Sequence, residues 1–209
     1  MCHPTTLAVA WDRVKSNGGS QTAGVDGVTK YNIEHRRGAD AFLKEIRDAL
    51  KARTFRPSLV RQRGIPKAGG KVRYLGIPTI RDRVVQMALK LILEPVFEAD
   101  FVATSYGFRP GRRAHDAIAE VYHFAQEPSN YTFVVEGDIE ACFDRIDHAS
   151  LLARIRRRIG DRRVLALLKA FVKAGVLTEA GTAERNVKGT PQGGIVTPPA
   201  MLLTGRTSS

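Results

Sequence analysis

The chain has 209 residues, 43% of them hydrophobic and 26% charged, so it is globular rather than disordered and can bury the core of one domain or two small ones. Without an apolar run of about 18 residues or a signal-peptide pattern, a cytoplasmic protein is expected. Two cysteines, Cys2 and Cys142, are too few for a disulfide framework, and they lack metal-ligand spacing.

Positive charge dominates, with 33 Lys and Arg against 21 Asp and Glu and a formal net charge of +12. Such an excess favours a polyanionic partner such as nucleic acid, while a solubilising surface is the alternative. The charge gathers between residues 44 and 90, where only three acids oppose thirteen basic residues: Lys44, Arg47, Lys51, Arg53, Arg56, Arg61, Arg63, Lys67, Lys71, Arg73, Arg81, Arg83 and Lys90. This segment predicts a surface that faces phosphates.

In the first part of the chain, a short amphipathic helix around residues 7–14 precedes a glycine-rich loop, "SNGGSQTAGVDG". Apolar residues at helical spacing predict a helix over residues 39–52. Strands are predicted over residues 59–65 and 71–77, and "PKAGG" between them predicts a basic hairpin whose tip can reach phosphates.

A long helix is predicted next, over residues 80–99, with Asp82 in its first turn, where the helix dipole favours an acid. Pro95 is expected to kink or end it. The basic, turn-rich loop "SYGFRPGRRAHDAI" leads into a helix over residues 114–125, which is expected to turn Ala117, Ile118 and Val121 inward.

The rest of the chain begins with "NYTFVVEGDI", whose β-branched and aromatic residues predict a buried strand. Helices are predicted over residues 150–159 and 161–173, and Gly175 is a plausible stop for the second one. Helices that alternate with short strands, without an internal repeat, predict a mixed α+β or α/β fold.

Four carboxylates follow the predicted buried strand: Asp138, Glu140, Asp144 and Asp147. At strand spacing Asp138 and Glu140 point the same way, and the Ile139 carbonyl lies between them, an oxygen set that suits Mg²⁺. The alternative is that these acids serve turns and loops.

Other residues near the acids have structural interpretations. In "DHAS", Asp147 and Ser150 are typical of a helix start. Phe143 can belong to a core, and His115 and His148 are interpreted as hydrogen-bonded structural or surface residues because no cluster of metal ligands surrounds them.

Five blocks in this order resemble the reverse transcriptases of group II introns, the intron-encoded reverse transcriptase/maturases. The first block, "AWDRVKSNGGSQTAGVDGVT", is similar to the N-terminal extension of that family. The second block is similar to the fingers; it begins with "FRPSLVRQRGIPKAGGKVRYLGIPT" and ends with "EPVFE". "SYGFRPGRRAHDAI" follows, "VVEGDIEACFDRIDH" is similar to the first palm motif, and "GTPQGGIVTP" is similar to the block that lines the nucleotide site.

The resemblance implies an α+β right-hand polymerase fold and RNA-directed DNA synthesis by two-metal phosphoryl transfer with Mg²⁺. It makes Asp138 the catalytic carboxylate and metal ligand, and the carbonyl of Ile139 a second ligand. Phe143 lies where the family places an aromatic steric gate that excludes a ribose 2′-hydroxyl.

The resemblance also implies roles for residues outside the palm motif. Lys67, Lys71 and Arg73 correspond to fingers residues that close over a deoxynucleoside triphosphate, and Gln192 and Gly193 correspond to nucleotide-site residues. Nucleic-acid contacts are expected from four arginines, two in the basic run and two in the "GFRPGRR" loop: Arg61, Arg63, Arg109 and Arg112. The expected partners are template or intron RNA, a DNA primer and the triphosphate.

The expected organisation is an N-terminal extension (1–38), fingers (39–130), a partial palm (131–198) and a divergent tail (199–209). The family's second acidic element, a Tyr-Ala-Asp-Asp type hairpin, is missing because the sequence contains no Asp-Asp pair and no acid after Glu184. We therefore expect an N-terminal fragment that is inactive alone, with an exposed strand edge and a tendency to self-associate. The alternative is a non-catalytic RNA-binding protein.

Overall fold

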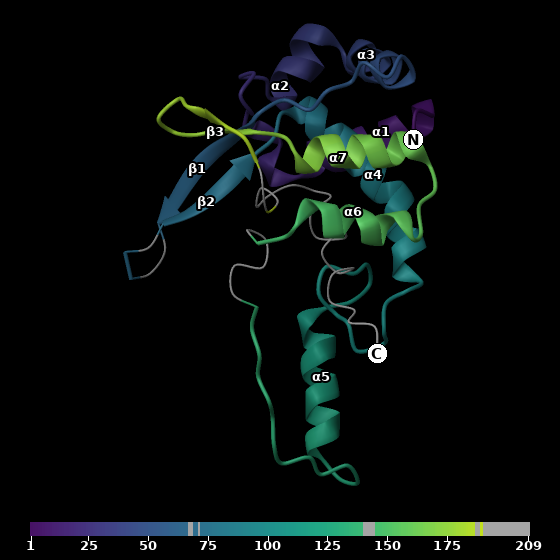
Figure 1. Ribbon diagram of the computed structural model, residues 1–209, viewed down its shortest axis with the longest axis vertical. Coiled ribbons are helices and arrows are strands. Elements are labelled where there is room, and N and C mark those ends of the chain that lie inside the picture. The colour runs from purple at the N-terminus through teal and green to yellow at the C-terminus, as the bar shows by residue number, and fades with distance from the viewer. Residues whose placement is uncertain (67–68, 71, 140–144, 187–188, 190–209) are drawn as a thin grey trace.

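The computed structural model describes residues 1–66, 69–70, 72–139, 145–186 and 189, and it combines helices with one small sheet (Figure 1). The predicted mixed α+β class is confirmed. The helices are α1 (Pro4–Ser16), α2 (Lys30–Asn32), α3 (Ala39–Lys51), α4 (Ile80–Glu98), α5 (Ala114–Ala125), α6 (His148–Arg156) and α7 (Arg162–Val172), with a 3₁₀ turn at Gly18–Gln21 and a π turn at Ile33–Arg37. Pro95 does not end α4, which continues to Glu98.

The sheet has the strand order β2-β1-β3-β4, formed by β1 (Val60–Pro66), β2 (Val72–Ile77), β3 (Val176–Leu177) and β4 (Ala183–Glu184). The predicted hairpin is confirmed as the antiparallel β1–β2 pair. β3 runs parallel to β1 and antiparallel to β4. The sequence analysis missed β3 and β4 because a strand of two residues carries no alternation.

Gly175 lies beyond the end of α7 at Val172, where the chain enters the sheet. A Cβ atom at this position would lie 2.7 Å from the Glu184 carbonyl oxygen and 2.8 Å from a methyl group of Leu59. Close packing at the sheet therefore requires a glycine here. The predicted role of Gly175 as the helix stop is wrong, because the C-cap of α7 is Lys173.

The core forms around α4, against which α1 packs, with α3, α6 and α7 contributing to the same buried cluster (Figure 1). Leu7 and Trp11 of α1 are buried with Ile46 of α3, Leu89 of α4 and Leu168 of α7. The N-terminal segment thus shares one core with the later helices. The division at residues 38, 130 and 198 stays a prediction.

The start of α4 is held by two buried polar residues. Thr79 is the N-cap, and its hydroxyl accepts a hydrogen bond from the Asp82 backbone N–H at 3.1 Å. The Asp82 carboxylate, which is 2% exposed, accepts one from the Ser58 N–H at 3.0 Å, and burial raises its pKa. Asp82 thus links the segment just before β1 to the first turn of α4. The helix-dipole argument favoured an acid at this position but did not predict that its side chain is buried.

Arg83 joins the glycine-rich loop to the β2–α4 connection. Its guanidinium group donates to the carbonyl oxygens of Pro78, Gly19 and Thr22, at 2.9, 2.6 and 2.8 Å. Burial lowers the pKa of this arginine. Gly24 of the same loop is buried against Thr79. The loop is therefore part of the packed structure.

Helix α5 extends away from the other helices (Figure 1), and none of its residues is buried. Ala117 is half-buried, but Ile118 and Val121 are 66% and 61% exposed, so the prediction that both turn inward is wrong. Periodicity indicates a helix and its apolar face, whereas burial needs a second element to cover that face.

The segment 130–139, predicted as a buried strand, is neither paired in a sheet nor buried in the described structure. Phe133 is 92% exposed and Val135 is 98% exposed. The predicted burial is therefore wrong, and because no strand forms here, the exposed strand edge expected at Asp138 is not observed either. No helix in the described part of the chain is long and apolar enough to cross a membrane.

Candidate nucleic-acid interface and metal-binding residues

The register of the β1–β2 hairpin places three predicted contact residues on one face. Arg61 pairs with Ile77, Arg63 with Leu75, and Ile65 with Arg73. Because side chains two residues apart share a face and paired residues share it across the ladder, Arg61, Arg63 and Arg73 lie on the same side of the hairpin. We call these three residues the hairpin arginines.

The hairpin arginines differ in exposure. The Arg63 side chain is 71% exposed, and Arg73 is exposed as well. Arg61 is half-buried, and its Nε atom is buried without a hydrogen-bond partner in the described structure. Two of the three guanidinium groups thus face solvent, where a phosphate could reach them.

Glu179, between β3 and β4, contacts the hairpin. Its carboxylate lies 3.6 Å from Nη1 of Arg63 and accepts a hydrogen bond from the Gly64 N–H at 3.2 Å. An exposed ion pair of this kind contributes little in water, about 0–1 kcal/mol, so it leaves Arg63 able to exchange Glu179 for a phosphate.

The tip of the hairpin contains Gly69 and Gly70, whose φ angles of 80° and 75° suit glycine. Lys67 and Lys71, predicted to contact the triphosphate, lie outside the described residues. Gln192 and Gly193 lie outside them too, so the triphosphate-binding roles of these four residues stay predictions.

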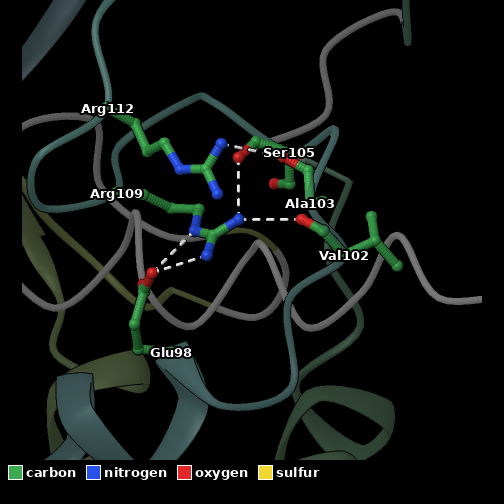
Figure 2. Close-up of polar contacts among 6 residues, drawn as sticks. All are labelled: Glu98, Val102, Ala103, Ser105, Arg109 and Arg112. Atoms are coloured by element: carbon green, nitrogen blue, oxygen red, sulfur yellow. Dashed lines mark hydrogen bonds and ion pairs between the residues drawn. The ribbon is translucent and has the colours of Figure 1, made fainter.

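Arg109 organises the loop between α4 and α5 (Figure 2). Its Nε and Nη2 atoms lie 2.9 and 2.6 Å from Oε1 of Glu98, and Nη1 donates to the carbonyl oxygens of Val102 and Ser105, both at 2.8 Å. The Arg109 side chain is 6% exposed, and its guanidinium group lies over Phe101. Arg109 therefore has a structural role that the sequence analysis did not predict.

Arg112 has fewer contacts in the same loop (Figure 2). It donates to the Ala103 carbonyl at 2.9 Å and lies over the ring of Tyr106. The expected contacts of Arg109 and Arg112 with template or nucleotide stay predictions. Of the two, Arg112 has fewer hydrogen bonds to lose on binding a phosphate.

Asp138 is exposed in the unpaired segment, and Ile139 beside it is 70% exposed. Glu140, Phe143 and Asp144 lie outside the described residues. Within the described ranges, no three His, Cys, Asp or Glu side chains lie close enough together to hold a metal ion. Of the residues predicted as metal ligands, the structure describes Asp138 and Ile139, and their role as ligands stays a prediction.

The structural interpretation of "DHAS" is confirmed. Asp147 is the N-cap of α6 and accepts a hydrogen bond from the Ser150 N–H at 2.7 Å, which lowers the pKa of this carboxyl group. His148 is buried, with Nε2 2.6 Å from the Gly189 carbonyl oxygen, and His115 is exposed. Both histidines thus have the structural or surface positions predicted for them.

Comparison with known families places the chain in a class. Residues 65–204 match the family described as reverse transcriptase (RNA-dependent DNA polymerase). Because the match covers more than half of the 209 residues, the chain belongs to this reverse transcriptase family. The predicted resemblance to reverse transcriptases is therefore confirmed. Enzymes of this family generally use divalent metal ions.

The relatives include proteins encoded by introns. Protein YkfC of Escherichia coli K12 is 40% identical over 197 residues, which cover 93% of this chain and 51% of YkfC. The group II intron-encoded protein LtrA of Lactococcus lactis subsp. cremoris is 37% identical over 199 residues, which cover 95% of this chain and 32% of LtrA. The chain thus spans about half of the one relative and a third of the other.

A similar fold occurs in a solved structure, the partial Cas6-RT-Cas1–Cas2 complex. The match has a TM-score of 0.59 and 20% identity, and it covers 97% of this chain and 32% of the other. At this identity the likeness concerns the fold alone, and it supports the predicted reverse transcriptase fold.

Proposed function

We propose that the chain provides the fingers and part of the palm of an RNA-directed DNA polymerase of the group II intron type. The observation that carries this proposal is that the hairpin arginines share one face of the β1–β2 hairpin in a chain of the reverse transcriptase family. These cations suit a primer–template backbone or a triphosphate, because positive charge stabilises the charge that develops on a transferring phosphoryl group.

Mg²⁺ is the proposed metal, with Asp138 and the Ile139 carbonyl as its ligands in the described part of the chain. Both are hard oxygen donors, and their exposure leaves them accessible to an ion that retains water and phosphate ligands. A bound Mg²⁺ would supply charge neutralisation at the phosphates. Further carboxylates are needed to complete the site.

The nucleotide-binding roles of Lys67, Lys71, Arg73 and Gln192 belong to the same proposal, with Phe143 as the sugar gate and Gly193 beside Gln192. Arg73 is the member of this group that the structure describes, and it is exposed on β2. The proposed substrates are deoxynucleoside triphosphates, added to a DNA primer on an RNA template.

A fusion protein tests the catalytic proposal. Residues 1–198 are joined to the part of the Lactococcus lactis LtrA chain that follows its match to this sequence, and incorporation of labelled deoxynucleotides on an RNA template is measured. We expect synthesis that falls at least 100-fold in the Asp138→Ala fusion, because a metal ligand is lost. Residues 1–209 alone are expected to give no incorporation.

Intact LtrA is the positive control. If the fusion folds and binds RNA but remains inactive under conditions where LtrA is active, the catalytic proposal is wrong. Asp138-dependent synthesis by residues 1–209 alone would instead contradict the expectation that this polypeptide is inactive by itself.

The second candidate function is RNA binding without catalysis. It is favoured by the hairpin arginines, which share one face of the hairpin and include the exposed Arg63 and Arg73. Simultaneous replacement of Arg61, Arg63 and Arg73 by alanine is expected to reduce the slope of log K against log salt concentration by about 1.5, because the phosphate contacts of the two exposed arginines are lost.

Fluorescence anisotropy with a structured RNA at several salt concentrations measures this slope, with Asp138→Ala as the matched control. The control is expected to bind like the unsubstituted chain, and an unchanged slope in the triple variant would show that the hairpin arginines do not contact RNA. Poor competition by duplex DNA is expected for a protein that recognises RNA shape.

The proposal also includes a cellular location and self-association of the chain. The cytoplasm is the proposed location, since two cysteines form no disulfide framework. Self-association is also proposed, supported by the exposed side chains of Val121, Phe133 and Val135, because burial of exposed apolar side chains favours association.

A further inference from the structure

A basic groove lies where α6 turns into α7. It has a volume of about 540 Å³, and the cations that line it are Arg156, Arg162 and Lys169, around the apolar side chains of Ile159 and Leu165. We call it the α6–α7 groove. In Figure 1 the connection between these two helices lies on the opposite side of the molecule from the β1–β2 hairpin, so the groove is separate from the hairpin arginines.

The geometry of α7 explains why the cations gather here. Arg162 and Lys169 are two helical turns apart on one face of α7, about 10 Å along its axis. Arg156 is the last residue of α6 and lines the same groove. Two of the three cations are therefore about 10 Å apart along one helix face, a separation that suits an extended polyanion better than a single small anion.

The charge of the groove is not neutralised within the described structure. Arg156, Arg162 and Lys169 are exposed, and none of them forms an ion pair with a residue that the structure describes. Two nearby acids have other partners. Asp161 caps α7 by accepting from the N–H groups of Arg163 and Val164, and Asp100 pairs with Arg158 at 2.8 Å.

We propose that the α6–α7 groove binds the phosphodiester backbone of RNA, at a position separate from the hairpin arginines. Arginine presents planar donors that match phosphate oxygens. The residues that line the groove include no aromatic ring on which a base could stack, so the contact is with the backbone and independent of sequence. The proposal shares its partner class with the proposed function but needs neither nucleotide addition nor a metal ion.

Charge reversal tests the proposal in the full 209-residue chain. The test variant carries Arg156→Glu, Arg162→Glu and Lys169→Glu. The control variant reverses three exposed cations elsewhere, Arg13, Arg36 and Arg185, so that both have the same net charge. Binding of a fluorescein-labelled RNA hairpin with a single-stranded tail is followed by anisotropy between 50 and 300 mM salt.

We expect the slope of log K against log salt to fall by about 2 more in the test variant than in the control, equally for RNAs of different sequence. An equal fall in both variants would overturn the proposal, since net charge alone would then explain it. So would a fall confined to one RNA sequence, or competition by polyglutamate as strong as by RNA, which would indicate a protein partner.

Two further measurements keep the test decisive. If the charge-reversed chain does not fold, the neutral variant Arg156→Gln, Arg162→Gln, Lys169→Gln replaces it. A photoreactive residue at the exposed position 166, which lines the groove, is expected to crosslink to RNA, and no crosslink would overturn the proposal. Repeating the titration with the hairpin arginines replaced by alanine separates the two surfaces, because the loss at the groove is expected to persist.

Discussion

Replacement of Arg109 by alanine is expected to lower the free energy of unfolding by about 2–3 kcal/mol, because it breaks an ion pair whose arginine is buried, while Glu98 is 29% exposed and regains some hydration. Glu98 would keep its charge without a counterion, and the carbonyl oxygens of Val102 and Ser105 would lose their donor. Urea unfolding followed by circular dichroism measures the change.

Arg112→Ala is the matched control from the same loop. Its side chain donates to one carbonyl oxygen and stacks on Tyr106, so a loss of about 1 kcal/mol is expected. Arg109→Lys should fall between the two, since lysine keeps the charge but not the planar fork of donors. Equal destabilisation by Arg109→Ala and Arg112→Ala would refute a central structural role for Arg109.

Replacement of Gly24 by alanine is expected to cost about 3 kcal/mol by forcing backbone apart. The added Cβ would lie 2.7 Å from both the N and Cα atoms of Thr79 and 3.0 Å from the Pro78 carbonyl carbon. Backbone atoms cannot rotate away as a side chain can. The strain falls on the N-cap of α4 and on the loop that Arg83 holds.

Gly18 provides the control, because a Cβ there would meet nothing within 4 Å. Gly18→Ala is expected to change stability by no more than about 0.5 kcal/mol. Thermal unfolding measures both variants, and limited proteolysis of the loop shows whether Gly24→Ala detaches it. If Gly24→Ala proves as stable as Gly18→Ala, the close approach between this loop and α4 is not maintained in solution.

Local signals in the sequence predicted much of the fold. The bounds of α5 agree with the prediction at both ends, and the β1–β2 hairpin and the cap of α6 at Asp147 were also predicted. Each depends on spacing, turn chemistry or capping within a few residues. Burial is different, as Ile118 shows, because it depends on whether another element covers the side chain.

The candidate site was predicted from family resemblance more than from local pattern. Composition indicated a basic surface, and only the strand register showed that Arg61, Arg63 and Arg73 share one face. The structural role of Arg109 could not be predicted, because its partners are backbone carbonyl oxygens and a glutamate eleven residues away. For Asp82, the Thr-x-x-Asp spacing was an available signal of a helix cap.

The parallel pairing of β1 with β3 has a consequence for biosynthesis. The hydrogen bond between Gly64 and Glu179 joins residues 115 positions apart. At about 5–20 residues per second, a ribosome needs on the order of ten seconds to make the intervening chain. During that interval the edge of β1 that later receives β3 has no partner, which makes the nascent hairpin a candidate for chaperone binding.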